Sequence, residues 1–485
     1  MPGSLFTQTA VAVALSSTLN VGLAARQSES SSPQTTLSVR AAIAEALDRS
    51  PDLRPAVDAV QLAQINERRA SAIFAPKLTP AFGSTSDPNG WSRHSAGLSL
   101  TTRLRSGGDV SVSGDWSRYG TGAGQIRDAG YTIAIAQPLL RGLWITAEAD
   151  VVNAKRAVGS AARDLTRHAE RLIMSVAATY LDIVRQSQAL EASRRSRDRA
   201  IRLRTMSDAR AKIGLATQLD VLRADILAAQ AEASVHLASE SLDTARDRLN
   251  ELLGRPLGDP VTPGADAVSE ADVLTRFMCA EDEPESCLSL DALVARALST
   301  RVDMLEARDR IGDARRSVAV SEWNLMPPVA LNVSYTRRGV GQPRETFLSA
   351  WNGWRVGLST SYTLDRSTET AAAAQAQIAL GAAVRSADDM ARRISSEVRA
   401  AHRAWQRAKS HIEIQRQAMA IAQKQLRLAE LRFERGLDGN LDVIDAENNL
   451  LQAETSLVGA QIDRVLALLT VRFATGTLDP QEFRR

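Results

Sequence analysis

The chain has 485 residues, of which 44% are hydrophobic and 24% charged. This composition excludes an intrinsically disordered chain, and the 28 glycines and 2 cysteines exclude the collagen-like and disulfide-rich classes. The 59 basic and 56 acidic residues are interleaved and give a net charge of +3, so the charge pattern predicts no nucleic-acid partner. After the N-terminal segment, no apolar run reaches the roughly 20 residues that a membrane-spanning helix needs.

The first 25 residues carry no charge. An apolar run followed by small residues, ending in Gly22-Leu23-Ala24-Ala25, predicts a secretory signal peptide over residues 1–25. No basic residue precedes the apolar run and serines interrupt it, so a disordered N-terminus or a misassigned start codon is the alternative. Residues 26–36 are rich in Ser and Gln, which predicts a linker. No cysteine lies near the predicted cleavage site, so we expect no N-terminal lipid anchor.

Two early segments are similar to two later ones. Leu37 to Asp58 matches Leu288 to Asp309 at nine of 22 positions, and Arg210 to Glu232 matches Arg432 to Glu454 at ten of 23. Such self-similarity indicates a tandem duplication. We assign a first repeat to residues 37–254, an inter-repeat linker to 255–287, a second repeat to 288–476 and a C-terminal tail to 477–485.

The offset between the repeats changes along the chain. It is 251 residues for the first pair of segments and 222 for the second, so the first repeat carries 29 additional residues. We place them in the Gly/Ser-rich stretch 88–124 as an inserted hairpin. Its strands are predicted at Ala96 to Leu104 and Asp109 to Trp116, around a Ser106-Gly107-Gly108 turn, and we expect the hairpin to extend on the extracellular side.

The sequence pattern of each repeat predicts three helices in the same order. The first helices cover Leu37 to Phe74 and Leu288 to Leu325, the long ones Ile145 to Asp208 and Ser367 to Arg435, and the last ones Thr217 to Leu253 and Asn440 to Ala474. At 1.5 Å per residue the first long helix spans roughly 96 Å, about the sum of the two shorter ones. These lengths predict antiparallel helical hairpins whose tips lie at the breaks, and the many alanines predict walls one helix thick.

Four further segments have the alternating pattern of β-strands: Leu78 to Ser84, Tyr131 to Leu140, Val329 to Arg337 and Arg355 to Leu364. Aromatic residues gather around them, as they do at the interfaces of transmembrane barrels. About four strands per chain cannot close a barrel, and open edges cannot face lipid. Three chains would supply 12 strands. The alternative is a soluble sheet that caps the helices. The fold class is therefore mainly α, with long helical hairpins and a membrane β-barrel closed by oligomerisation.

Other residues suggest little chemistry. The five histidines share no metal-ligand spacing, so we expect neither a metal, a cofactor nor an enzymatic activity. The basic run from Arg194 to Arg202 is interpreted as a solvated helix face, with pairing between protomers as the alternative. Cys279 and Cys287 are predicted to form a disulfide in an oxidising compartment, and a metal site is the weaker alternative.

The sequence resembles the TolC-like outer-membrane efflux protein family. The resemblance is carried by ALDRSPDLRPA, AQPLLRG and the paired motifs KIGLATQLDVLRA and ERGLDGNLDVIDA. It implies a homotrimer with a 12-stranded barrel in the outer membrane and an α-helical barrel through the periplasm. It also implies a passive exit duct of a tripartite efflux or type I secretion system, which docks to a periplasmic adaptor and an inner-membrane transporter. A periplasmic coiled-coil scaffold or an adhesin without a pore, or an adaptor subunit, is the alternative.

The same resemblance implies an acidic ring at the periplasmic entrance. Asp442 and Asp445 stand six and nine residues after Gly436, where the family has its acidic positions, and Asp220 is the repeat equivalent of Asp442. The tips, at which we expect adaptor docking, are Gly214, Leu215, Gly436 and Leu437. At the gate, Phe433 lacks the hydroxyl of the aromatic residue that the family has there, and Asp438 replaces a basic residue of the family. We therefore expect packing or other pairs to hold the closed state.

Overall fold

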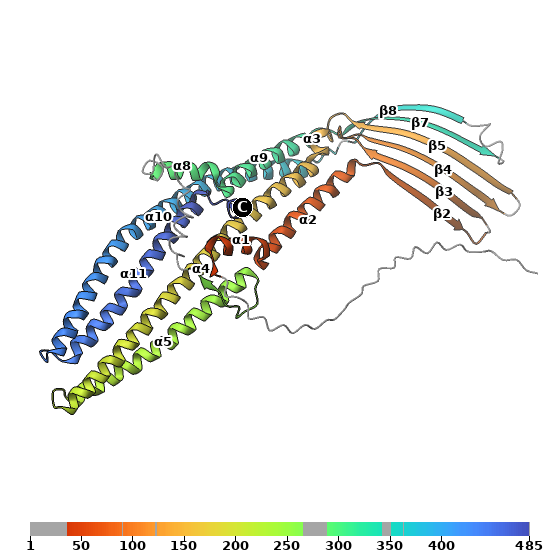
Figure 1. The fold of residues 1–485 in the computed structure, drawn as a ribbon. Helices are drawn as coiled ribbons and strands as arrows, with labels where there is room; N and C mark the ends of the chain where they lie inside the picture. Colours follow the sequence, from red (N-terminus) through yellow and green to blue (C-terminus); the bar gives the residue numbers. More distant parts are fainter. Residues whose placement is uncertain are drawn as a thin grey trace, which may run out of the picture. The chain divides into compact units, whose positions relative to one another are not determined.

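The computed structural model describes residues 36–89, 91–121, 124–264, 289–341, 351–361 and 363–484. The predicted signal peptide, nearly all of the 26–36 linker, and both Cys279 and Cys287 lie outside these ranges, as does most of the inter-repeat linker. Residues Thr36–Arg485 form one compact unit. It contains long helices and a six-stranded sheet (Figure 1).

Each repeat begins with two short helices rather than one. In the first repeat they are α1 (Val39–Arg49) and α2 (Arg54–Ser71), and in the second α8 (Leu290–Thr300) and α9 (Val302–Trp323). The expectation of one continuous helix is wrong in both repeats. Pro51 explains the first break, because proline lacks the N–H that continues a helical hydrogen-bond pattern. The second break has no proline and occurs at Arg301, whose backbone is extended.

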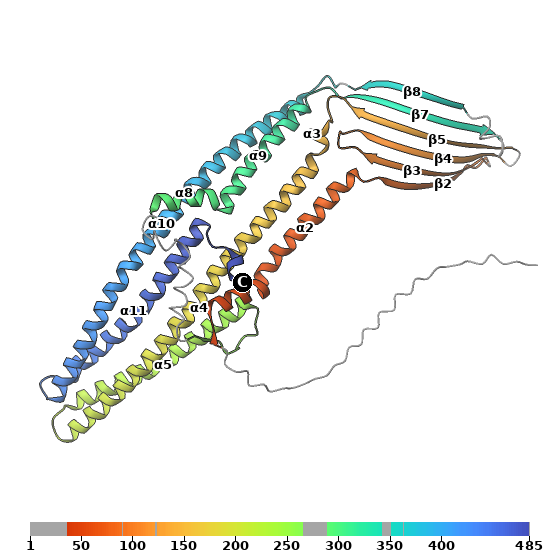
Figure 2. The ribbon, with the colours of Figure 1, turned by 45° about the horizontal axis from the view of Figure 1, so that its top comes forward.

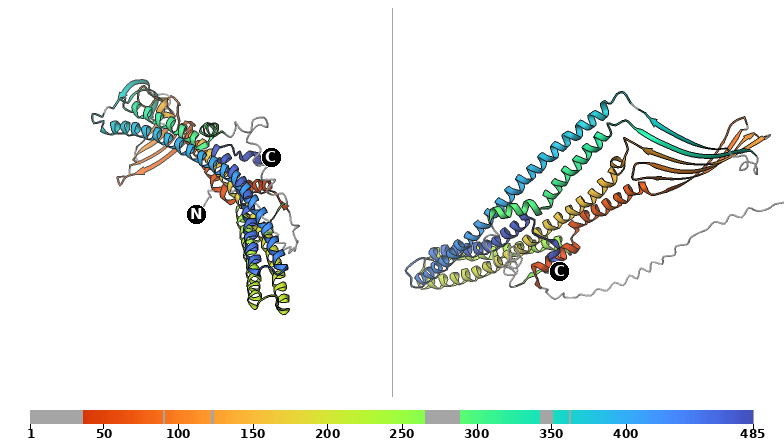
Figure 3. Two further views of the ribbon diagram at one scale, coloured as in Figure 1. Left: turned by 90° about the vertical axis from the view of Figure 1, so that its left-hand side faces the viewer. Right: turned by 90° about the horizontal axis from the view of Figure 1, so that it is seen from above.

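Two long hairpins form the rest of the helical part. α4 (Ala149–Lys212) follows the short α3 (Trp144–Ala147) and turns into α5 (Gln218–Leu253), whereas α10 (Ser367–Glu434) turns into α11 (Asn440–Thr475). α4 packs against α2 and α9 near the sheet, and against α5 and α11 toward the tips. Figures 2 and 3 show the two hairpins side by side at the end remote from the sheet. The first repeat thus contacts the second along most of α4.

The sheet has the strand order β2-β3-β4-β5-β7-β8, and all neighbours are antiparallel. The strands are β2 (Lys77–Ser86), β3 (Ser92–Arg103), β4 (Asp109–Thr121), β5 (Gly124–Pro138), β7 (Val329–Gly341) and β8 (Trp351–Thr360). The pairing of β5 with β7 joins the two repeats. A separate parallel pair links β1 (Thr36–Leu37) to β6 (Thr262–Pro263), and a 3-10 turn (Pro480–Phe483) ends the described chain.

The prediction of about four strands is wrong, because the inserted segment forms two full strands inside the sheet. β3 and β4 pair along their whole length with each other, and with β2 and β5 on either side. Their connecting turn lies at the helical end, where the Ser106 hydroxyl donates to Gln137 Oε1 at 3.0 Å. The insertion therefore widens the sheet instead of extending beyond its far end. The expected 12-strand total for three chains loses its basis.

The two faces of the sheet differ in chemistry. One register row carries large apolar side chains on all six strands: Leu78, Leu100, Val112, Ile133, Tyr335 and Trp354. The adjacent row, which projects from the opposite face, carries five hydroxyls: Thr79, Ser99, Ser113, Thr132 and Thr336. Since side chains alternate along a strand, one face is apolar and the other polar. Most of the apolar side chains are exposed, up to 84% for Phe82 on edge strand β2 and 75% for Trp354 on edge strand β8.

The buried side chains form three clusters along the helices. The largest surrounds Tyr180 on α4, whose hydroxyl donates to the Leu37 carbonyl at 2.6 Å. A second, rich in alanine, fills the tips of both hairpins, and a third lies between α8, α9, α10 and α11. Among the described residues, no helix offers an apolar stretch long enough to traverse a bilayer.

The last helix of each repeat ends in contact with the break between the first two helices of the same repeat. Gly254 and Gly476 follow α5 and α11 with φ of +69° and +65°. A Cβ on Gly254 would lie 3.1 Å from the Arg49 carbonyl oxygen, and one on Gly476 would lie 3.1 Å from Arg301 Cα. Both contacts require a residue that tolerates the left-handed region and has no side chain.

Gly476→Ala should therefore lower the free energy of unfolding by about 1–2 kcal/mol, because alanine is strained at positive φ and collides with Arg301. Gly459→Ala is the matched control, since Gly459 lies inside α11 with open space around it. That substitution should stabilise by about 0.5–1 kcal/mol. Thermal unfolding followed by circular dichroism checks both signs. A Gly476→Ala protein as stable as the unmodified one would contradict the close contact.

Candidate functional site

The two hairpin tips have the same backbone geometry. Gly214 and Gly436 adopt φ of +78° and +73°. The next residue, Leu215 or Leu437, donates its N–H to the carbonyl five residues earlier, at 2.9 Å in both tips. This arrangement ends a helix in a glycine-dependent turn. It leaves the Leu215 and Leu437 side chains 68% and 69% exposed at the ends of the hairpins.

Asp220 is engaged within its own tip. Its carboxylate accepts hydrogen bonds from the Thr217 backbone N–H at 3.0 Å and from the Thr217 hydroxyl at 2.7 Å, and Thr217 in turn caps the start of α5. The hydrogen bond from the Thr217 side chain holds the pKa of Asp220 below its usual range. This carboxylate therefore has a local structural role, which gives no support to its inclusion in an acidic ring.

Asp442 and Asp445 lie differently, although Asp442 is the repeat equivalent of Asp220. α11 begins after Gly439, which has no side chain for a capping box. Asp442 and Asp445 are exposed on one side of α11, while Val443 and Ala446 on the other side are buried in the tip cluster. Within the described residues, neither carboxylate has a hydrogen-bond or ion-pair partner. Two free carboxylates one turn apart are thus available to solvent or ions.

Contacts between the repeats hold the tips together. The Arg210 guanidinium lies 4.7 Å from the centre of the Phe433 ring, and it donates to the carbonyls of Phe433 and Glu434. The Asn440 side chain donates to the Asp220 carbonyl at 2.6 Å. These bonds cross from one hairpin to the other, so they link the first repeat to the second at the point where the chain turns.

Arg210 is the last of seven arginines that extend from α4 toward the second repeat. We call them the arginine stripe: Arg156, Arg163, Arg167, Arg185, Arg195, Arg199 and Arg210. Successive members are 7, 4, 18, 10, 4 and 11 residues apart. Five of the six intervals lie within half a residue of a multiple of 3.6, and the interval of 10 deviates by less than one residue, so all seven lie on one face of the helix.

Near the tips, the stripe pairs with acidic residues of α11. Arg199 Nε lies 2.8 and 2.7 Å from the two carboxylate oxygens of Glu447, which is only 3% exposed. More exposed pairs join Arg195 to Glu454 at 3.2 Å and Arg185 to Asp463 at 3.1 Å. The interpretation of Arg194 to Arg202 as a solvated face is therefore wrong for Arg199, which is largely buried against Glu447. Arg195 is exposed as expected, although it also pairs with a distant part of the same chain.

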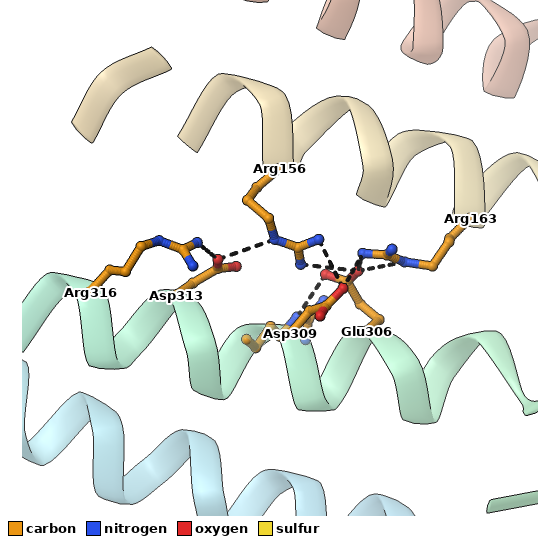
Figure 4. Close-up of polar contacts among 7 residues, drawn as sticks. Arg156, Arg163, Glu306, Asp309, Asp313 and Arg316 are labelled. Carbon is orange, nitrogen blue, oxygen red and sulfur yellow. Dashed lines mark hydrogen bonds and ion pairs between the residues drawn. The ribbon is translucent and has the colours of Figure 1, made fainter. Parts of the chain in front are cut away.

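Near the sheet, the stripe pairs with α9. Figure 4 shows Arg156 and Arg163 above three carboxylates of that helix. Arg163 Nη2 lies 2.6 Å from Glu306 and 3.0 Å from Asp309, and Arg156 lies 2.9 Å from Asp309 and 3.2 Å from Asp313. Burial alone would raise the pKa of Glu306, but the hydrogen bond from Arg163 and the nearby arginine charges hold it below the usual range. Glu306 therefore stays ionised at neutral pH, although it is largely buried.

The residues that link the repeats were missed because their partners are distant in sequence. The helical spacing of the arginines was visible, but it does not say which acidic residues they face. The expectation that other pairs replace the family's gate contacts remains a prediction about the closed state, and Arg210 and Asn440 are its candidates. In the described part of the chain, no three His, Cys, Asp or Glu side chains lie close enough together to hold a metal ion.

The chain matches a known protein family. The model described as "Outer membrane efflux protein" matches residues 42–255 and 293–477, which together are most of the chain. The two matched ranges correspond to the two repeats.

Individual proteins show the same likeness. The outer membrane protein TolC of Vibrio cholerae is 25% identical over 315 residues, or 64% of this chain and 69% of that protein. The alkaline protease secretion protein AprF of Pseudomonas aeruginosa is 25% identical over 267 residues, which are 55% of this chain and 53% of that protein. The chain thus spans about half to two thirds of these relatives. The crystal structure of the outer membrane protein VceC from Vibrio cholerae has the same fold, with a TM-score of 0.66 and 21% identity, over 90% of this chain and 96% of that one.

The buried pair in the stripe gives a prediction. Arg199→Met leaves the Glu447 carboxylate buried without a counter-charge, so it should destabilise by about 3–5 kcal/mol. The double variant Arg199→Met/Glu447→Leu should recover most of this loss, because it removes both charges. Arg195→Met is the control at an exposed pair and should cost less than about 1 kcal/mol. Denaturation of the purified protein measures all three. Equal losses for Arg199→Met and Arg195→Met would contradict a special role for the buried pair.

Proposed function

Since the chain belongs to the outer membrane efflux protein family, we propose that it forms a homotrimeric exit channel. The family places the protein in the outer membrane and its function in efflux. The channel would conduct cargo passively from a periplasmic adaptor and an inner-membrane transporter to the exterior, in efflux or in type I secretion. The likeness to a protease secretion protein supports secretion as well as efflux.

The proposal rests mainly on the difference between the two faces of the sheet, one of which is apolar and the other polar. Its apolar row extends across all six strands and is largely exposed, while the opposite face carries hydroxyls. A soluble sheet that capped the helices would bury its apolar face against them. A barrel wall needs the apolar face toward lipid and the polar face toward water. The two faces therefore favour a membrane wall.

Closure of this wall requires several copies. β2 and β8 are unpaired edges, and an open edge cannot face lipid because its backbone groups would lack partners. With six alternating strands, β8 of one copy is antiparallel to β2 of the next. Three copies then close an all-antiparallel barrel of 18 strands. A barrel widens roughly in proportion to its number of strands, so this exit would be about half again as wide as one of 12 strands.

The tips supply the entrance. Asp442 and Asp445 of three copies would bring six carboxylates together around the axis, which would attract cations. Asp220 would stay outside this set, because it caps its own helix. The exposed Leu215 and Leu437, with their preceding glycines Gly214 and Gly436, would present an apolar rim to the adaptor.

A periplasmic scaffold or adhesin without a pore is the rival function. It would need no amphipathic sheet, and it would not conduct ions. Single-channel recording of the purified oligomer in planar bilayers separates the two. Discrete conductance steps support the channel, and a correctly folded oligomer without conductance would contradict it.

The entrance assignment is tested by the double variant Asp442→Ala/Asp445→Ala. It should reduce cation selectivity and the block by polyvalent cations, because the negative field at the entrance is removed. Asp220→Asn is the matched control and should leave selectivity unchanged while destabilising the start of α5 by about 1 kcal/mol. Reversal potentials in a salt gradient measure selectivity. Unchanged selectivity in an assembled double variant would contradict the ring.

A further inference from the structure

One row of the sheet carries three basic residues. The register places His94 opposite Arg118, and Arg118 opposite Arg127. Because side chains alternate along a strand, this row projects from the same face as Trp116, two residues earlier in β4, and Tyr131 in β5. β4 begins at the helical end, and Arg118 lies near its last residue, so the row lies near the end of the sheet remote from the helices. The row therefore forms the outer rim of the apolar face.

The two arginines of this row are not neutralised within the described chain. Like charges directly opposite each other on neighbouring strands destabilise the pairing. In the ranges that the structure describes, neither Arg118 nor Arg127 has a hydrogen-bond or ion-pair partner on its guanidinium. Arg338, on the polar face of the same sheet, is held by Asp115 at 2.9 Å and Asp128 at 3.1 Å. The polar face thus supplies counter-charges for Arg338, whereas no acidic side chain of the described strands lies on the face that carries Arg118 and Arg127.

The position of the row matches the boundary of a membrane. The register row of Gln137, which holds Leu331 and Leu358, lies ten residues from Arg127 on β5. That is roughly 34 Å along a strand, or about 26 Å along the membrane normal for strands tilted by about 40°. The lipid-facing band of an outer-membrane barrel is about 25 Å tall and is bordered by aromatic residues. Trp116 and Tyr131 occupy that border here. His94, Arg118 and Arg127 then lie at the level of the lipid headgroups.

We infer that His94, Arg118 and Arg127 bind the phosphate groups of a glycolipid in the outer leaflet. The inference rests on the proposed function, because only a sheet that crosses the outer membrane brings this row to that leaflet. Guanidinium groups bind phosphate oxygens bidentately. A phosphate between Arg118 and Arg127 removes their mutual repulsion. The Ser84 hydroxyl, 3.0 Å from His94 Nδ1, orients the imidazole beside them.

Native mass spectrometry of the full-length oligomer, titrated with bis-phosphorylated lipid A, tests the site. Arg118→Gln/Arg127→Gln should weaken binding roughly ten- to thirtyfold, since each arginine at a membrane surface contributes about a fivefold factor. Arg93→Gln/Arg355→Gln is the matched control, because it removes the same two charges from the polar face. Its affinity should equal that of the unmodified protein. Equal affinity of the Arg118/Arg127 variant would overturn the inference.

Two further ligands identify the source of the phosphate. Dephosphorylated lipid A should bind as weakly to the unmodified protein as lipid A binds to the Arg118→Gln/Arg127→Gln variant, and excess inorganic phosphate should not displace lipid A. Equal binding of the dephosphorylated lipid, or displacement by inorganic phosphate, would overturn the assignment to a lipid headgroup. If the glutamine variant does not assemble, Arg118→Lys/Arg127→Lys keeps both charges but loses bidentate geometry, and its affinity should fall. An unchanged affinity of that lysine variant would overturn the phosphate contact.

Bilayer recordings from the same preparation separate this inference from the proposed function. Conductance without a preference for phosphorylated lipid contradicts the lipid site alone. A folded protein that binds lipid A but has no conductance contradicts the channel.

Discussion

The arginine stripe on α4 holds the two repeats in register, because its members reach α9 near the sheet and α11 near the tips. Large side chains fill the cluster around Tyr180, whereas the buried tip residues are mainly alanines that each bury little area. Helices packed through such small side chains could slide past one another. The seven arginines pair with acidic residues or carbonyls of α9, α10 and α11, and so set the register between the repeats. An exposed ion pair contributes little by itself, whereas Arg199 with Glu447 is buried and tolerates no loss of one partner.

The register set by the helices continues into the sheet. β5 belongs to the first repeat and β7 to the second, and their pairing over twelve residue pairs makes one sheet from two repeats. That continuity aligns the apolar row across all six strands. The inserted β3 and β4 keep the same alternation, so they widen the apolar face without interrupting it. The contact between the two repeats therefore continues from the helices into the sheet, and it aligns both the periplasmic wall and the proposed membrane wall.

Local features could be predicted from the sequence, and distant pairings could not. The long helices and the glycine tips were predicted because helical periodicity and a glycine break act over a few residues. Thr217 and Asp220, three residues apart, carried the pattern of a capping box that would have revealed the local role of Asp220. The break at Arg301 could not be predicted, because no proline occurs there. The place of β3 and β4 inside the sheet depends on pairing with β2 and β5, and strand alternation alone does not specify neighbours.

We propose that three copies close one channel through the edges β2 and β8. Electron cryomicroscopy of the protein in lipid nanodiscs tests it most directly, because it resolves both the number of copies and the number of strands. We expect a threefold assembly with 18 strands, in which β8 of each copy lies beside β2 of the next. An assembly of 12 strands, or a folded protein in which β2 and β8 remain unpaired in the membrane, would contradict it.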